Sequence, residues 1–429
     1  MRNNLRKVAI VGGVRIPFAR ANTAYVKLGN LEMLTAAIKA IVDKFKLQGQ
    51  QLGEVAGGAV IKHSRHWNLT REAVLSSGLD PHTPAYDVVR ACGTSLTATS
   101  QLAHRIALGE IDSAIAGGTD SASDVPITFG ENFSRILLES ARGKTFADRL
   151  NPWLRLRPQD LRPAYSGATE PRTGLTMGEH CELMAKEWNV GRREQDELAY
   201  QSHMKAAAAW KEGFYNDLVV PFEGLAVDNN VRPDTDMVKL GALKPAFDRS
   251  GTGTLTAGNS TPLTDGAACV LLASEDWAKA RGLPIQAYFT HHQSAAVDFA
   301  GLRGNREGLL MAPTYAIPRM LDQAGLKLQD FDIYEIHEAF AAQVLCTLKA
   351  FESEEYCRTT LGRNGALGPI DRAKLNPKGS SVALGHPFAA TGARIVATLA
   401  KELEQRGSGR GLISICTAGG MGVTAILER

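Results

Sequence analysis

Paired cysteines are missing from this sequence of 429 residues, although six cysteines are present. No two of them are spaced as Cys-x-x-Cys, the spacing typical of structural zinc sites and of many disulfide-rich secreted domains. A disulfide scaffold and a structural metal site are therefore not expected, and free thiols are typical of a reducing compartment. The six residues are Cys92, Cys181, Cys269, Cys346, Cys357 and Cys416.

Long apolar runs and an excess of charge of one sign are missing as well. No apolar stretch approaches the roughly 20 residues that a membrane-spanning helix requires, and residues 1–13 are too short for a signal peptide. The net charge of +3 is too small to argue for nucleic-acid binding. We therefore expect a soluble, cytoplasmic protein that does not bind nucleic acid.

Glycine is plentiful, at 42 residues, and marks a pattern that occurs once in each half of the chain. In the first half, a turn at Cys92 leads into a helix and then into the strand "SAIAGGTDSAS". In the second half, "SSVALGHPFAATGARIVATLAKELEQRG" predicts a strand, a turn at His386 and a helix, followed by the strand "GLISICTAGGMG". The pattern is typical of a duplicated α/β unit built on buried strands.

The length of the chain exceeds what one hydrophobic core normally serves, so two or three folded units are expected. We expect a first half at residues 1–123, completed by about 250–283, and a second half at 284–429. Residues 124–249 are richer in charge and predict an inserted domain. Its stretch "RGKTFADRLNPWLRLRPQDLRP" mixes basic and apolar residues, which fits either an anionic ligand or membrane surface, or a solvated loop packed by its own aromatic residues.

Cys92 lies where an apolar, strand-like run gives way to the start of a helix. Unpaired backbone N–H groups at a helix start, together with the helix field, favour a thiolate, which is a good nucleophile. A buried structural cysteine is the alternative interpretation. Three more reactive side chains follow apolar strands or end them: His337, His386 and Cys416. Because strand ends of an open α/β sheet are where sites assemble, the four together predict one catalytic site.

The motifs "RACGTS", "HEAFAAQ", "GHPFAATGAR" and "CTAGGMG", in this order, resemble those of the thiolase superfamily. The similarity covers essentially the whole chain, including "NSTPLTDGAA" before the second half. A His before "EAF" and the long basic insertion resemble most closely the thiolase β-subunits of fatty-acid β-oxidation (trifunctional) complexes. The resemblance implies an α/β thiolase fold, a duplicated five-layer αβαβα architecture with an inserted loop domain.

The activity implied by the resemblance is CoA-dependent thiolytic cleavage of 3-ketoacyl-CoA, which reverses a Claisen condensation. Cys92 would be acylated, His386 would take its proton, and Cys416 would exchange the proton at the α-carbon of acetyl-CoA. His337, with an ordered water, and His386 would face the enolate oxygen. Backbone N–H groups of Cys92 and Ala418 would hold the second oxyanion. The family usually has Gly where this chain has Ala418, and the methyl group leaves the N–H available.

The resemblance also implies where coenzyme A and acyl-CoA, the substrates, make contact. Arg232 in "NNVRPD" would lie by the nucleotide, and Thr261 would touch pantetheine, although the family more often has Ser-Gly at this position and the next. Met177 and Phe340 would line the acyl pocket, or would be ordinary core. No metal and no cofactor is implied. Glu338 either orients His337 or caps the helix that follows.

Alternative functions and partners remain open at this stage. A biosynthetic acetoacetyl-CoA thiolase shares the motifs, and a decarboxylating 3-ketoacyl synthase shares the duplicated fold but needs no second cysteine. A non-catalytic lipid-carrier or scaffold subunit is less consistent with four retained reactive side chains. We expect a homodimer or larger assembly. The insertion is a candidate for contact with a hydratase/dehydrogenase α-subunit or with a membrane surface.

Overall fold

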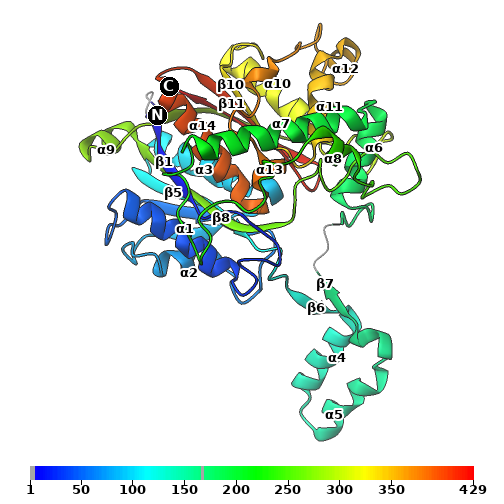
Figure 1. The fold of residues 1–429 in the computed structure, drawn as a ribbon. Helices are drawn as coiled ribbons and strands as arrows, with labels where there is room; N and C mark the ends of the chain where they lie inside the picture. The colour runs from blue at the N-terminus through cyan, green and yellow to red at the C-terminus, as the bar shows by residue number, and fades with distance from the viewer. Residues whose placement is uncertain (1–4, 166–168) are drawn as a thin grey trace.

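One mixed β-sheet runs through the computed structural model, which describes residues 5–165 and 169–429 (Figure 1). A short strand, β2 (Ala19–Arg20), pairs with the first two residues of β8, Thr264 and Asp265. Along the sheet the strands are β4 (Ala85–Asp87), β3 (Glu54–Gly57), β5 (Ser113–Asp120), β8 (Thr264–Ser274), β1 (Val8–Arg15), β9 (Ala287–Ala296), β12 (Met421–Glu428), β11 (Arg410–Thr417) and β10 (Ile333–Ile336).

The strand order repeats, as the sequence pattern predicts. In the first half, β3 and β5 are parallel, and β8 and β1 follow with antiparallel pairing. In the second half, β10 and β11 are parallel, and β12 and β9 follow in the same way. The halves join where Ala9 and Ile10 of β1 pair with Tyr288 and Ala287 of β9. The chain therefore contains the duplicated α/β unit.

Helices form layers on and between the two halves of the sheet. Helices α3 (Thr94–Leu108) and α14 (Thr391–Arg406) share a buried apolar cluster with strands of both halves. On the outside, α1 (Asn30–Lys44) and α2 (Leu69–Leu75) cover the first half. Helices α10 (Pro313–Ala324) and α11 (Ala341–Glu352) cover the second. This is the expected αβαβα arrangement, and α9 (Glu275–Ala280) and α12 (Glu354–Thr359) are short additions.

The two central helices approach each other closely because α14 has glycine at the crossing. A Cβ atom on Gly392 would lie 2.4 Å from the backbone N of Leu96 in α3. The Ser95 hydroxyl also accepts a hydrogen bond of 2.8 Å from the backbone N–H of Ala393. This contact brings the beginnings of α3 and α14 together, and both candidate catalytic segments lie at those ends.

One local expectation from the sequence is wrong. The residues before His386 form the short helix α13 (Ser381–Leu384), not a strand. Gly379 and Gly385 flank it with φ values of +75° and +105°, which turn the chain at both ends. All four residues of α13 are buried, so the apolar run reflects burial and not strand periodicity. His386 therefore follows a helix.

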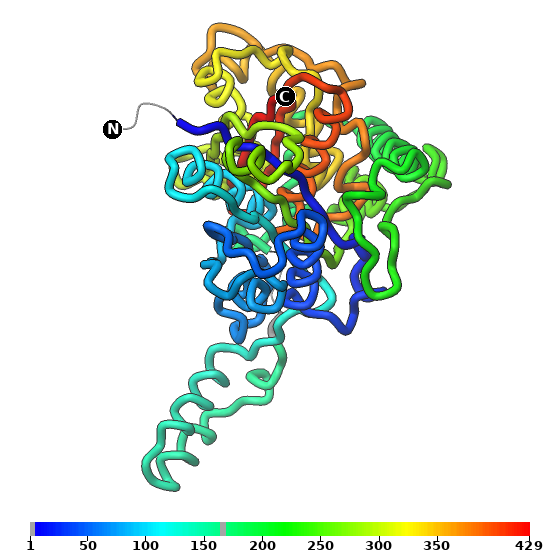
Figure 2. The backbone as a smooth tube through the Cα atoms, turned by 90° about the vertical axis from the view of Figure 1, so that its left-hand side faces the viewer, coloured from blue at the N-terminus to red at the C-terminus, as the bar shows by residue number. Residues whose placement is uncertain are grey.

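Residues 124–249 divide into a projecting arm and a part that packs on the body. We call residues 127–165 the arm; it extends away from the sheet (Figures 1 and 2). The arm contains β6 (Ile127–Phe129), α4 (Glu131–Arg142), α5 (Phe146–Leu150) and β7 (Pro163–Tyr165). The part on the body contains α6 (Met177–Glu187), α7 (Arg192–Lys211) and α8 (Met237–Gly241). Of the predicted ranges, residues 1–4 and 166–168 lie outside the described residues.

The arm has a small aromatic interior of its own. The Phe133 ring meets Phe129 and Trp153 edge-on, with centroids 4.9 and 6.1 Å apart. Packing by its own aromatic residues is therefore present. Large apolar side chains nevertheless remain exposed on it, Phe146 at 78% and Leu154 at 85%. In the described part of the chain, no helix is both long enough and apolar enough to cross a bilayer.

Candidate active site

Cys92 lies in a single helical turn, Ala91–Gly93, that leads directly into α3. Ala91 adopts φ +43°, a left-handed conformation that alanine rarely takes. A Cβ on Gly93 would lie 2.3 Å from a methyl carbon of Val423, so the start of α3 lies directly on β12. The strained turn and the close contact fix Cys92 between the two halves, where its side chain is only half-buried.

His386 contacts the thiol directly. Its Nε2 lies 3.1 Å from Sγ of Cys92, and its Nδ1 lies 2.5 Å from the hydroxyl of Thr391. The backbone N–H of His386 donates to the hydroxyl of Thr264 in β8 at 2.7 Å. The ring is therefore held from both sides, with one nitrogen aimed at the sulfur.

His337 follows β10 and lies beside the same pair. Its ring centroid is 4.2 Å from that of His386, and its Nδ1 is 2.7 Å from Oγ of Ser381. Its Nε2 is buried and has no hydrogen-bond partner among the described residues. A polar nitrogen left this way is costly unless a ligand meets it. One nitrogen of each ring and the sulfur of Cys92 lie within 4.8 Å of one another, a set that zinc also accepts.

Cys416, the second predicted thiol, is the last residue but one of β11 and is buried. It lies close enough to Cys92 that a negative charge there raises its pKa. Backbone N–H groups of Ala418 and of Cys92 itself point at the sulfur of Cys92. The structure therefore brings Cys92, His337, His386 and Cys416 together, with the two amides predicted for the oxyanion hole beside them.

Burial controls the protonation of these groups. Burial raises the pKa of the Cys92 thiol to about 12, against the smaller opposing effect of the two amides. It also lowers the pKa of His386 to about 3, with a further contribution from Arg394. The resting pair is therefore a neutral thiol and a neutral imidazole, and not the thiolate expected from the helix field. Burial also raises the pKa of Cys416 well above its usual range, which keeps a proton on that sulfur.

Of the two predicted CoA contacts, Arg232 lines a surface cleft and Thr261 does not. Arg232 is exposed and lines this cleft of about 370 Å³ together with Arg20 and Lys239. Ser260 lines it too, and its buried hydroxyl has no partner among the described residues. The hydroxyl of Thr261 instead donates to the carbonyl oxygen of Ser381 at 3.0 Å. Ser260 is thus a polar group that the sequence interpretation missed.

Met177 and Phe340 belong to the apolar cluster that contains Cys416. Phe340 is 8% exposed and packs edge-on against Phe247, with ring centroids 5.7 Å apart. Met177 is half-buried against the same cluster. Both predicted acyl-pocket residues therefore lie on the apolar side of the site.

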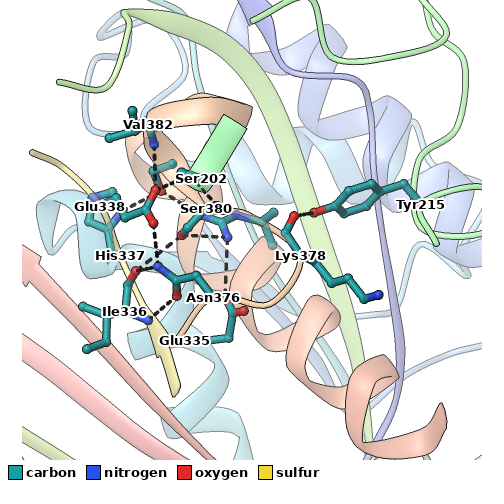
Figure 3. A network of polar contacts seen from close by, with 12 residues as sticks. Ser202, Tyr215, Glu335, Ile336, His337, Glu338, Asn376, Lys378, Ser380 and Val382 are labelled. Atoms are coloured by element: carbon teal, nitrogen blue, oxygen red, sulfur yellow. Dashed lines mark hydrogen bonds and ion pairs between the residues drawn. The ribbon is translucent and has the colours of Figure 1, made fainter. Parts of the chain in front are cut away.

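Glu338 orients neither His337 nor the following helix directly. Its buried carboxylate accepts hydrogen bonds from Ser202 of α7 at 2.6 Å, from Asn376 at 2.7 Å and from the N–H of Val382 at 3.3 Å (Figure 3). It therefore fastens the end of β10 to the insertion and to α13. The sequence predicts that Glu338 orients His337 or caps the following helix. The structure shows neither contact and instead shows these three hydrogen bonds.

Glu170 is a second carboxylate that the sequence interpretation missed. It comes from the insertion, is 6% exposed, and accepts a hydrogen bond of 2.6 Å from the N–H of Gly419. Gly419 and Gly420 have φ values of +77° and +67°, a turn that L-residues rarely adopt. Glu170 therefore holds the turn that presents the amide of Ala418. No local sequence signal marks it, because its partner is 249 residues away.

Comparison with known proteins places this site in a family. The family model described as "Thiolase, N-terminal domain" matches residues 8–276, and "Thiolase, C-terminal domain" matches residues 284–429. The chain belongs to the thiolase family. This thiolase is 43% identical over 428 residues to a 3-ketoacyl-CoA thiolase of Pectobacterium carotovorum, covering 98% of this chain and 96% of that protein.

Two further relatives agree with this assignment. A 3-ketoacyl-CoA thiolase of Yersinia pestis is 41% identical to this thiolase, over 98% of this chain and 97% of the relative. The crystal structure of the Bacillus anthracis acetyl-CoA acetyltransferase superposes with a TM-score of 0.83 at 30% identity, covering 99% of both chains. The predicted thiolase fold is therefore confirmed.

Proposed function

We propose that this thiolase cleaves 3-ketoacyl-CoA with CoA to give acetyl-CoA and a shortened acyl-CoA, as a step of fatty-acid β-oxidation. The proposal is carried by one observation, the convergence of two thiols and two imidazoles from both halves of the duplicated fold. It is supported by relatives named 3-ketoacyl-CoA thiolase, which are 41% and 43% identical over nearly the full chain.

In the first half of the reaction, Cys92 attacks the 3-keto carbon while its proton moves to Nε2 of His386. Because the resting pair is neutral, proton transfer accompanies the attack. The N–H groups of Cys92 and Ala418 hold the tetrahedral oxyanion, and removing one such donor costs ~3 kcal/mol. The C2–C3 bond then breaks, leaving an acyl group on Cys92 and the enolate of acetyl-CoA.

Release of both products completes the proton balance. The enolate oxygen faces His337 and His386, and Cys416 gives its proton to C2, which forms acetyl-CoA. The pKa of Cys416, raised by burial, suits a sulfur that must arrive protonated. CoA then attacks the acyl group, its thiol proton passes to the Cys416 thiolate, and the proton on His386 returns to Cys92. No metal or redox group enters any step.

In this proposal CoA is bound by residues of the cleft, and the acyl chain is bound by the apolar cluster. Arg232, with Arg20 and Lys239, provides positive charge for the phosphates of CoA at the outer end of the cleft. The unpartnered hydroxyl of Ser260 and the backbone near Thr261 suit the amides of pantetheine. Met177 and Phe340 provide apolar surface for the acyl chain beside Cys416.

Assembly, location and domain limits belong to the proposal too. Strand β4 is an edge of the sheet, with Val89 just beyond it 60% exposed, which suits edge-to-edge pairing in a homodimer. The arm suits a hydratase/dehydrogenase partner or an anionic lipid surface. We retain a cytoplasmic location, with the two thiolase halves at 1–123 plus about 250–283 and at 284–429, and the insertion at 124–249.

Three measurements test the activity. Intact-protein mass spectrometry after mixing with an acyl-CoA should show one acyl adduct, which the Cys92→Ala variant lacks; no adduct on the wild-type chain would favour a scaffold. Cys416→Ala should abolish thiolysis, whereas retained decarboxylative condensation would indicate a 3-ketoacyl synthase. Steady-state kinetics should show turnover of ketoacyl-CoAs from short to long. Turnover of the four-carbon substrate alone would instead indicate a biosynthetic acetoacetyl-CoA thiolase.

A further inference from the structure

Two imidazoles face one thiol in this site. The proposed function requires opposite protonation states at their inner nitrogens, the two Nε2 atoms that face the thiol. The Nε2 of His386 must accept the proton of Cys92, so it must start unprotonated. The Nε2 of His337 must donate to an oxygen that becomes negative, so it must carry a proton. The hydrogen bonds at the outer nitrogens, the two Nδ1 atoms, decide which ring nitrogen carries the proton in each histidine.

For His386 the outer partner is the Thr391 hydroxyl, at 2.5 Å from Nδ1. The inner nitrogen lies 3.1 Å from Sγ of Cys92. A neutral ring that takes the thiol proton on Nε2 carries its own proton on Nδ1 and donates it to Thr391. Thr391 therefore acts as an acceptor.

For His337 the outer partner is also a hydroxyl, but this one is already engaged. The Oγ of Ser381 lies 2.7 Å from Nδ1 of His337 and 2.7 Å from Nη2 of Arg394. A guanidinium has only donors, so Ser381 accepts from Arg394. The single proton of Ser381 is then available for Nδ1 of His337.

The reverse arrangement leaves the network unsatisfied. If Nδ1 of His337 carried the proton, two donors would meet at the oxygen of Ser381. The hydroxyl proton of Ser381 would then have no acceptor among the described residues, and the Nε2 facing the site would be a bare lone pair. Buried polar groups are rarely left in that state. The arrangement that satisfies Arg394, Ser381 and Nδ1 puts the ring proton on Nε2.

Arg394 is built into the core at this point. It is 1% exposed, it lies 3.7 Å from the carboxylate of Glu335, and one Nη lies 3.3 Å from Oγ of Ser380. Burial lowers the pKa of His337 well below its usual range, and the positive charge of Arg394, like any positive charge that His386 acquires, lowers it further. The ring therefore stays neutral, and only its tautomer remains to be set.

We propose that Arg394 and Ser381 are positioning residues that hold His337 in its Nε2–H tautomer, so that it always presents a hydrogen-bond donor to the substrate oxygen. The two hydroxyls, Ser381 of α13 and Thr391 of α14, thus act in opposite directions. Thr391 accepts and leaves His386 a base, whereas Ser381, directed by Arg394, donates and makes His337 a donor. This inference deepens the proposed function and rests on it.

The test compares Ser381→Ala with Ser380→Ala in the full chain. Both variants remove a hydroxyl that contacts Arg394, but only Ser381 contacts His337. Exchange of the methyl protons of acetyl-CoA with D₂O reports enolate formation. It should fall about twofold or more in Ser381→Ala, because the oxyanion donor is then present in only part of the population. It should stay close to wild type in Ser380→Ala, and Ser381→Thr, which keeps the hydroxyl, should restore it.

A spectroscopic readout separates this role from a merely structural one. Nitrogen-15 NMR of histidine-labelled protein, assigned with His337→Asn, should show His337 protonated at Nε2 and unprotonated at Nδ1. In Ser381→Ala the two nitrogens should become averaged. Acylation of Cys92, which uses His386, should proceed in Ser381→Ala at a rate close to wild type.

The outcomes that overturn the inference differ from those that overturn the function. Protonation of Nδ1 of His337 in the wild-type chain, or equal exchange rates in Ser381→Ala and Ser380→Ala, would refute the role of Arg394 and Ser381. Absence of any acyl adduct on wild-type Cys92 would instead refute the proposed function.

Discussion

At the scale of single residues, the proposed catalysis depends on groups that stay neutral until substrate binds. Burial raises the pKa of Cys92 to about 12 and lowers the pKa of His386 to about 3. Neither group is charged at neutral pH, although they lie 3.1 Å apart. In the proposed reaction, Cys92 is therefore activated by proton transfer during attack, and His386 is available as the base at almost every pH.

This neutral pair predicts the pH dependence of Cys92 alkylation by iodoacetamide. In the wild-type chain the rate should change little between about pH 5 and 8, because His386 is unprotonated throughout that range. In His386→Ala the thiol must ionise alone, so the rate should be lower and should rise about tenfold per pH unit. The measurement is mass spectrometry of Cys92 against time, with Cys92→Ser as the blank. A wild-type rate that rises steeply with pH would contradict the assignment of His386 as base.

The reactive residues could be found from the sequence because each belongs to a short motif. Cys92, His337, His386 and Cys416 are identified by their neighbours, and the structure places their side chains close together, while their catalytic roles stay a prediction. Their protonation could not be found in the same way. It depends on burial and on residues such as Arg394, whose contact with Ser381 becomes visible only when α14 and α13 are placed side by side.

At the scale of elements, the turn after β11 is held by a residue of the insertion. The carboxylate of Glu170 accepts from the N–H of Gly419 at 2.6 Å, and the hydroxyl of Thr417 donates to the carbonyl of Ala418 at 2.9 Å. These contacts fix the turn that aims the amide of Ala418 at Cys92. The insertion therefore takes part in positioning the predicted oxyanion hole as well as in the predicted CoA contacts.

Glu170→Ala should lower kcat about tenfold with little change in KM. Loss of the acceptor frees the turn, and the amide of Ala418 is then less well aligned with the tetrahedral oxyanion, which exists only near the transition state. Glu170→Gln keeps an acceptor oxygen and serves as the matched control, with kcat near wild type. Steady-state thiolysis and a thermal melt of each variant provide the measurement. An unchanged kcat in Glu170→Ala would show that the turn keeps its conformation without the Glu170 carboxylate.

The elements themselves were only partly predictable. The helix after Cys92 and the strands that contain or precede paired glycines match their predicted places. Residues 381–384 were predicted as a strand because they are apolar, whereas they form a buried helical turn between two glycines. Apolar runs of this length do not distinguish a buried strand from a buried helix, and only the packing decides.

At the scale of the whole molecule, the arm is the feature that the active site does not explain. Residues 127–165 project from the body (Figure 2), and their basic and apolar composition was visible in the sequence, but their shape was not. The arm begins and ends as a hairpin, in which Phe129 of β6 pairs with Pro163 of β7. The pairing means that the arm can be removed without separating the ends that it joins.

Replacing residues 130–162 by an Asn-Gly turn, which suits a two-residue hairpin, should leave thiolysis of short, soluble ketoacyl-CoAs within about twofold of wild type.

The exposed Phe146 and Leu154 lie among several arginines, so sedimentation with vesicles rich in anionic lipid should be lost with the arm. Phe146→Ser combined with Leu154→Ser keeps the charges and should weaken sedimentation, which separates apolar insertion from simple attraction of charge. The wild-type chain could instead fail to sediment with vesicles and bind a hydratase/dehydrogenase subunit only when the arm is present. That result would show that the arm is a protein-docking element. If neither binding changes on deletion, the arm has no docking role.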